Sequence, residues 1–203
     1  MSAQIARLAE QIGVDPKVLL AIQKVESSSS PRKVRFEPHL FHRDTSNRYV
    51  AQIPWTKSRG NVSLVSSETN REAFERAYRL DPAIAVRSSS WGRYQILGGA
   101  GIALFGSPPA FVAAFDENPD LTSDQLLVKW FSSRPNAIAA ANAKDWPRLA
   151  QLYNGSSTSP WLGRFIRAYE GSGTGGAGAF AWVLGAALAG GLGARWVRRR
   201  QAR

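Results

Sequence analysis

The chain of 203 residues has no cysteine, and its only histidines are His39 and His42. Without cysteine it can form neither a disulfide framework nor a thiolate metal site. Two histidines are also too few to indicate a structural zinc site, so we expect no metal and no cofactor. Both histidines are interpreted as hydrogen-bonded loop residues.

Acidic residues are scarce as well, with 15 Asp and Glu against 26 Lys and Arg, which gives a formal net charge of +11. Five arginines lie within residues 195–203, and subtracting them leaves +6 for residues 1–194. A positive excess favours polyanionic partners such as nucleic acid, anionic lipid or bacterial wall polymers. Nucleic acid is disfavoured, because the clustered arginines follow an apolar segment and do not alternate with aromatic residues on a helix face. The N-terminus lacks the apolar stretch of an ordinary secretory signal.

Apolar residues recur at helical spacing through most of the chain. They predict a short helix over 3–13 and a second over about 16–26, which is opened by Asp15 as N-cap and Pro16 at the first position. Residues 27–68 have no clear period, and we expect a loop-rich or small β insertion there. Later helices are predicted after a capping box at 69–72 and near 92–105, 108–116, 122–131, 135–143, 145–153 and 160–169. The fold class is therefore mainly α.

The composition changes sharply after residue 170. Residues 171–176 contain only Gly, Ser and Thr, which predicts a flexible linker between a body at 1–170 and a tail at 177–203. The tail begins with 18 uncharged residues and ends in the arginine cluster. This pattern predicts a C-terminal membrane-type helix with a basic anchor, although a disordered Gly/Ala-rich tail is the alternative. Deletion of the tail would then reduce membrane association.

Glu26 stands at the end of the second predicted helix, four residues after Ile22 and next to Val25. Its carboxylate therefore projects from the face that is predicted to be buried. A carboxylate there is costly unless it is paired, hydrogen-bonded or protonated, and desolvation raises its pKa. A glutamate that keeps its proton near neutral pH suits the general acid of a glycosidase. The alternative is a solvent-facing glutamate at a frayed helix end.

Three separated motifs accompany this glutamate. Glu26-Ser27 is followed by Ser90-Trp91-Gly92-Arg93-Tyr94-Gln95-Ile96 and then by Tyr153-Asn154-Gly155. Their order resembles the goose-type lysozyme and soluble lytic transglycosylase superfamily. The intervening Arg35-Phe36-Glu37-Pro38-His39-Leu40-Phe41 makes residues 15–170 similar to the N-acetylmuramidase family found among bacteriophage endolysins and prophages. One departure is that residues 27–34 are rich in serine and arginine, where we would expect more glycine.

The resemblance implies a lysozyme-like helical domain and assigns roles to these residues. Glu26 would be the general acid, and Glu37 the leading second catalytic carboxylate, with Asp44 in reserve. A salt bridge of Glu37 with Arg35 or Arg43 is an equally open interpretation.

The resemblance also implies a substrate site and places aromatic residues around it. Gln95, Tyr153 and Asn154 would be substrate-binding residues for the N-acetyl sugars. Tyr94 is interpreted as a core aromatic, whereas Trp91 is left open.

The expected activity is hydrolysis of the peptidoglycan glycan strand between N-acetylmuramic acid and N-acetylglucosamine, causing lysis. Two alternatives remain: a lytic transglycosylase that uses the same acid, and a non-catalytic, membrane-tethered protein that binds the cell wall. The resemblance and the tail together predict a protein of phage or prophage origin, associated with the bacterial inner membrane and acting on periplasmic peptidoglycan.

Overall fold

The computed structural model describes residues 2–26, 30–58, 61–64 and 69–172, with only the backbone described over 56–58 and 61–64. By contacts the chain divides into a unit of residues 1–173 and a second of residues 174–203. All the elements below belong to the first unit; the second lies outside the described residues.

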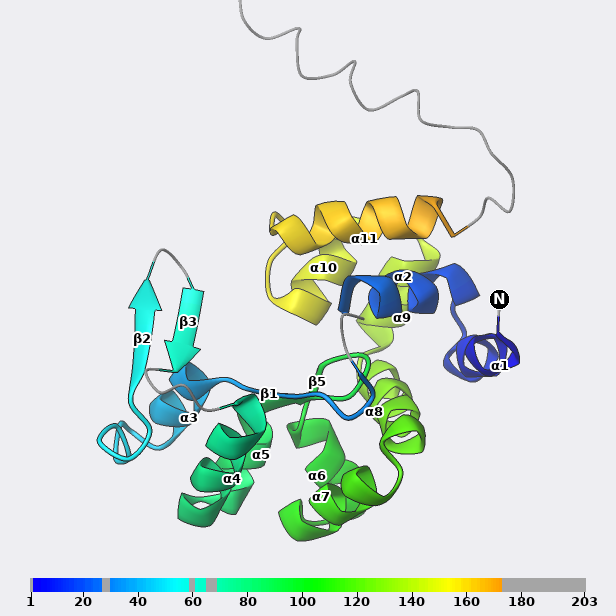
Figure 1. The fold of residues 1–203 in the computed structure, drawn as a ribbon. Helices are drawn as coiled ribbons and strands as arrows, with labels where there is room; N and C mark the ends of the chain where they lie inside the picture. The colour runs from blue at the N-terminus through cyan, green and yellow to red at the C-terminus, as the bar shows by residue number, and fades with distance from the viewer. Residues whose placement is uncertain (1, 27–29, 59–60, 65–68, 173–203) are drawn as a thin grey trace, which may run out of the picture. The chain divides into compact units, whose positions relative to one another are not determined.

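Helices dominate the described part of the chain (Figure 1). They are α1 (Ala3–Ile12), α2 (Pro16–Glu26), α3 (Pro38–Asp44), α4 (Asn70–Leu80), α5 (Pro82–Arg87), α6 (Gly99–Phe105), α7 (Pro108–Glu117), α8 (Pro119–Ser132), α9 (Pro135–Asn142), α10 (Trp146–Asn154) and α11 (Pro160–Glu170). The strands are β1 (Val34–Phe36), β2 (Trp55–Ser58), β3 (Asn61–Leu64), β4 (Ser89–Trp91) and β5 (Ile96–Leu97). The expected mainly helical, lysozyme-like body is confirmed.

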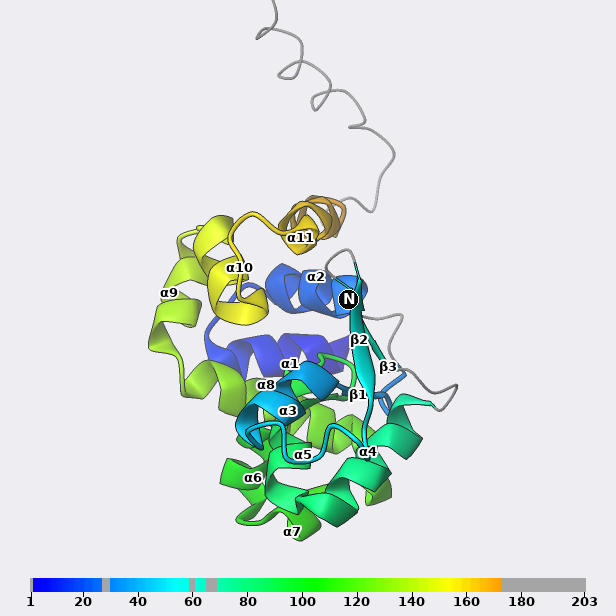
Figure 2. The same cartoon turned by 90° about the vertical axis from the view of Figure 1, so that its left-hand side faces the viewer.

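One group of helices surrounds α2, which packs against α1 on one side and along α11 on another (Figures 1 and 2). The helix begins as predicted, because Asp15 Oδ1 accepts a hydrogen bond from the Lys17 amide at 2.8 Å. Val18 and Ile22 are fully buried, so the predicted apolar face is the packed face. The last residue of this helix is Glu26, which places its side chain at the edge of this group.

A second group, formed by α4 to α7, packs around Trp91. The indole meets Phe74, Phe111 and Phe115 edge to face, with ring centroids 4.7–4.9 Å apart. Trp91 and Tyr94 are both fully buried, which confirms Tyr94 as a core residue. Helix α8 contacts α1 and α9 on one side and α6 and α7 on the other, so it joins the two groups.

A small antiparallel sheet of order β1-β4-β5 lies between the groups, with Val34 opposite Trp91 and Trp91 opposite Ile96. The prediction of one helix over 92–105 is wrong in its first half, because residues 92–97 form a turn and a strand before α6. Gly92 and Gln95 adopt positive φ angles of 69° and 49°, which a helix does not allow. The β2–β3 hairpin matches the predicted β insertion (Figure 1).

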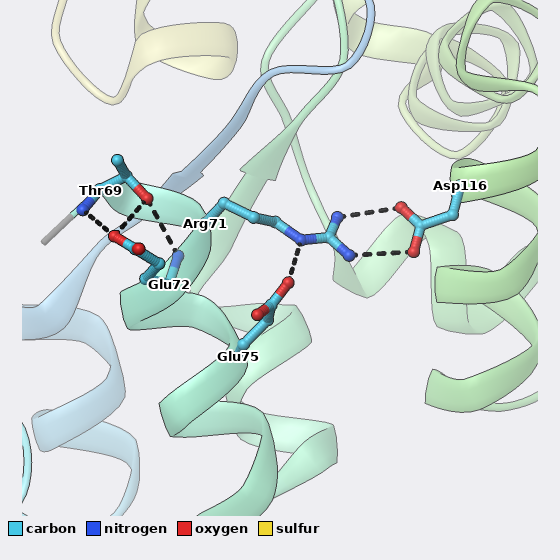
Figure 3. Close-up of polar contacts among 5 residues, drawn as sticks. All are labelled: Thr69, Arg71, Glu72, Glu75 and Asp116. Atoms are coloured by element: carbon cyan, nitrogen blue, oxygen red, sulfur yellow. Dashed lines mark hydrogen bonds and ion pairs between the residues drawn. The ribbon is translucent and has the colours of Figure 1, made fainter.

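The predicted capping box is present at the start of α4 (Figure 3). Thr69 Oγ1 accepts from the Glu72 amide at 3.3 Å, and Glu72 Oε2 accepts from the Thr69 amide at 2.7 Å. The bond from the Thr69 amide, together with one from the Thr69 hydroxyl to the same oxygen, lowers the pKa of Glu72. Arg71, the second residue of α4, donates a hydrogen bond to Glu75 one turn later in the helix. It also makes two hydrogen bonds of 2.9 Å to Asp116, which connect α4 to α7 (Figure 3).

The expected fold included a C-terminal membrane-type helix, and this part is corrected. Among the described residues no helix is both long and apolar enough to cross a bilayer, and the longest, α8, has 14 residues. The segment on which that expectation rested, 177–203, lies outside the described residues. Membrane association therefore has no support in the described part of the chain.

Candidate active site

The carboxyl group of Glu26 is held by a side chain that lies far from it in the sequence. Its Oε1 accepts a hydrogen bond of 2.8 Å from the indole Nε1 of Trp161, 135 residues away. Trp161 is buried in the first turn of α11, the helix that packs most extensively on α2. The packing of these two helices thus fixes the orientation of the carboxyl group.

The environment of Glu26 favours its protonated form. Burial raises the pKa of this carboxyl above its usual value, because desolvation penalises the ionised state. The Trp161 hydrogen bond and the positive charges of Arg35, Arg164 and Lys33 act in the opposite direction and do not overcome burial. The raised pKa predicted from the helix face is confirmed.

Four aromatic side chains pack in a row beside the Glu26 carboxyl group and form what we call the aromatic wall: Trp130, Tyr153, Trp161 and Phe165. Tyr153 stands between Trp130 and Trp161, with ring centroids 4.9 and 5.3 Å away, and Trp161 stacks in turn on Phe165 at 5.1 Å. Burial, followed by the nearby charge of Glu26, raises the pKa of Tyr153 well above its usual range. Tyr153 is therefore a neutral neighbour of the acid. Its hydroxyl donates to the backbone carbonyl of Tyr94.

Glu37 follows β1, and its surroundings are charged. Arg35 Nε donates to Glu37 Oε1 at 2.6 Å, and His39 Nδ1 lies 3.9 Å from Glu37 Oε2. Of the two salt-bridge partners considered from the sequence, the structure selects Arg35. The positive charge of the same Arg35 also lowers the pKa of Glu26, so one side chain interacts with both predicted catalytic carboxylates.

The Gly-x-x-Gln motif forms the turn between β4 and β5. Gly92 has φ +69°, and a Cβ added there would lie 2.0 Å from Ser123 Oγ, so the position accepts only glycine. Gln95 Nε2 donates to the Gly92 carbonyl at 2.8 Å and closes the turn. The side-chain nitrogen of Gln95, a residue predicted to bind sugar, therefore stabilises its own loop. Gln95 Oε1 is buried and has no hydrogen-bond partner among the described residues.

Two other predicted residues also have structural partners. Exposed Asn154 donates from Nδ2 to Ser159 Oγ at 2.9 Å, which links the ends of the α10–α11 loop. Asp44, the reserve carboxylate, is exposed at the end of α3 and pairs with Arg43 at 2.6 Å. It is therefore not part of the Arg35–Glu37 pair.

The histidines lie in α3 and not in a loop, which corrects that expectation. His42 Nε2 is 2.6 Å from the Ile53 carbonyl, and its ring stacks on Trp55 with centroids 6.2 Å apart. Over the residues described, no group of three or more His, Asp or Glu side chains is arranged to hold a metal ion.

Sequence reasoning missed Trp161, Lys33 and Arg164 as neighbours of the acid. Trp161 and Arg164 are separated from Glu26 by more than a hundred residues, and no local periodicity indicates that α11 lies on α2. Lys33 precedes a three-residue strand that was predicted as an irregular segment. Only the tertiary contacts bring these side chains together.

Comparison with known proteins adds a family and a fold. The family model described as N-acetylmuramidase matches residues 15–162. The solved structure titled "Crystal structure of Burkholderia AP3 phage endolysin" superposes with a TM-score of 0.66 at 22% sequence identity, covering 84% of this chain and 70% of that one. No protein with a curated description matches significantly in sequence.

Proposed function

This chain belongs to the N-acetylmuramidase family and is a glycoside hydrolase of the lysozyme type acting on peptidoglycan, and we propose that Glu26 is its general acid. The observation that carries the proposal is the state of this carboxyl: burial raises its pKa, and the Trp161 indole fixes its orientation. A general acid must be protonated at working pH and aimed at the leaving oxygen. The enzyme assignment also displaces the alternative of a non-catalytic wall-binding protein.

The hydrogen bond pattern indicates which oxygen carries the proton. Trp161 Nε1 donates to Oε1 of Glu26. In a protonated carboxyl group the carbonyl oxygen accepts hydrogen bonds more readily than the hydroxyl oxygen. Oε1 is therefore assigned as the carbonyl oxygen, and Oε2 carries the proton. In the proposed step Oε2–H protonates the glycosidic oxygen while the C1–O bond breaks, and positive charge develops on the ring of the N-acetylmuramic acid.

Glu37 is proposed as the second carboxylate, which positions a water molecule or stabilises that positive charge. Its support is the shared neighbour Arg35, which is hydrogen-bonded to Glu37 and acts on Glu26. Water adding to C1 would complete hydrolysis and regenerate the protonated Glu26. The bond between N-acetylmuramic acid and N-acetylglucosamine is the proposed site of cleavage.

The substrate-binding roles of Gln95, Tyr153 and Asn154 remain predictions. Each makes a hydrogen bond within the protein, to Gly92, Tyr94 and Ser159 respectively. We propose that they shape the sugar site chiefly by holding the 92–95 turn and the aromatic wall in place.

Product analysis tests this function. Purified peptidoglycan digested by the wild-type protein should release muropeptides that end in a reducible N-acetylmuramic acid, as mass spectrometry before and after borohydride reduction would reveal. Termini of the 1,6-anhydro type would instead identify a lytic transglycosylase, in which the sugar's own hydroxyl replaces water. The Glu26→Gln protein should release neither product.

In its biological setting we propose an endolysin of phage or prophage origin that causes bacterial lysis. The support is the family together with the endolysin fold of the Burkholderia phage structure. Expression inside a bacterium, combined with a permeabilised inner membrane, should lyse wild-type producers and spare cells that make Glu26→Gln.

A further inference from the structure

Three positive side chains from two parts of the chain act electrostatically on the proposed acid. Lys33 and Arg35 flank Val34 at the start of β1, and Arg164 lies one helical turn after Trp161 on α11. Val34 and Phe36 are buried, so by strand alternation Lys33, Arg35 and Glu37 project to the opposite face.

Among the described residues, two of the three cations form no ion pair. Arg35 pairs with Glu37, but within the described ranges neither Lys33 nor Arg164 forms an ion pair or a side-chain hydrogen bond. Arg164 is exposed and Lys33 half-buried, so both can be reached by a ligand. The backbone of Lys33 is nevertheless fixed, because its carbonyl accepts from the Gly92 amide at 2.8 Å.

These charges oppose the chemistry that the site is proposed to perform. Each favours the ionised form of Glu26, whereas a general acid must keep its proton. Each would also repel the positive charge that develops on the sugar ring. A neutral glycan offers nothing to offset this effect, whereas a bound carboxylate would neutralise it.

We infer that Lys33 and Arg164 form a carboxylate-binding subsite beside Glu26, which selects anionic peptidoglycan strands over neutral polymers of N-acetylhexosamines. The inference rests on the proposed function. Muramic acid carries a lactyl carboxylate, and when that group is joined to a stem peptide the peptide supplies carboxylates of its own. Charge-assisted hydrogen bonds from an ammonium and a guanidinium suit either source.

The test compares the double variant Lys33→Gln/Arg164→Gln with wild type on purified walls and on the same walls after carbodiimide amidation of their carboxylates. Because both side chains are open to solvent, loss of their two ion pairs with the substrate should lower kcat/KM on native walls about tenfold, mainly through KM. On amidated walls variant and wild type should be equally active. The matched control, Arg79→Gln/Arg87→Gln, removes two exposed positive charges from α4 and α5 and should behave as wild type on both substrates.

A third substrate separates the two sources of carboxylate. Amidase treatment removes the stem peptides and frees the lactyl carboxylates, which are amide-linked in native walls: a tenfold loss that appears only on these stripped strands identifies the lactyl group, and a loss confined to intact walls identifies the stem peptide. An equal loss on native and amidated walls, or no loss at all, would overturn the subsite. Failure of the proposed function looks different, because wild type would then be inactive on every substrate or Glu26→Gln would remain active.

Discussion

The region around Glu26 and the region around Glu37 surround the same kind of side chain with different neighbours. Glu26 ends a helix packed in an apolar group, and among the described residues its carboxyl group accepts one hydrogen bond, from the Trp161 indole. Glu37 follows a strand and is held by Arg35, with His39 nearby. Burial dominates the first site, and an ion pair dominates the second.

This difference indicates a division of labour. A carboxyl group whose pKa is raised by burial is suited to donating a proton, as Glu26 is proposed to do. A carboxylate bonded to a guanidinium is held in one orientation, as suits a group that orients water or faces a developing cation. Variants of the two regions test this division of labour.

The largest effect is expected for Glu26→Gln. Glutamine keeps the shape of the side chain but has no acidic proton, so kcat on purified peptidoglycan should fall about 10³-fold or more. Dye release from labelled walls measures the rate, and circular dichroism checks the fold. Glu10→Gln, on the exposed face of α1, is the matched control and should retain full activity. Full activity of Glu26→Gln would refute the assignment of the acid.

Glu37→Gln should cost less, on the order of 100-fold in kcat, because the carboxylate is proposed to assist the step and not to supply the proton. The double variant Arg35→Gln/Glu37→Gln shows whether the loss comes only from leaving Arg35 unpaired. We expect no recovery in the double variant. Recovery to wild-type rates would show that Glu37 serves only as the ion-pair partner of Arg35 and would refute its assignment as a second catalytic carboxylate.

Trp161→Phe should shift the pH profile. The indole hydrogen bond favours ionised Glu26, so its removal raises the pKa of Glu26 further. A general acid loses activity as the pH rises through its pKa, and the alkaline limb of kcat/KM should therefore move to higher pH. Trp146→Phe is the matched control, since Trp146 packs on Phe165 and Tyr169 without bonding to the acid. An unmoved limb in Trp161→Phe would contradict this coupling.

The smallest effect concerns stability. Because the folded-state pKa of Glu26 lies above its unfolded value, the folded protein loses stability as the pH rises through that interval. Glu26→Gln should therefore have a higher Tm than wild type at pH 8, and the difference should shrink toward zero near pH 3, well below the unfolded-state pKa, where the carboxyl is protonated in both states. Thermal unfolding at the two pH values measures this. A Tm advantage that is equal at both would show that titration is not its cause.

Much of the helical framework was predictable, because it depends on local patterns. The bounds of α2 and α11 follow from apolar periodicity and from proline at the first helical position. Two short helices were missed, α3 and α5, and each also begins at a proline. In α3, Pro38 stands at the first helical position inside a segment expected to be loop-rich, and a proline at that position starts a helix as readily as a later one ends it.

The turn at 92–95 shows where pattern reasoning fails. Its residues have no helix-breaking proline, and Trp91, Tyr94 and Ile96 are compatible with a helical face. Pairing of β4 with β1, 55 residues earlier at the Val34–Phe36 strand, decides the conformation instead. Gly92 then accommodates the close approach of Ser123, which only the folded chain reveals.

Glu26 was selected as the candidate acid from the sequence alone, since a carboxylate on an apolar helix face must be buried at a cost or used, and the accompanying motifs indicated the family. The sequence likewise determined the helical body and the positive charge. Only the tertiary structure decided the orientation and the pKa of that carboxyl. Trp161 and Arg164 lie on α11, more than a hundred residues later in the chain, and Lys33 and Arg35 lie at β1. Local periodicity encodes which face of a helix is buried, whereas the neighbours of a buried group depend on contacts between segments that are distant in the chain.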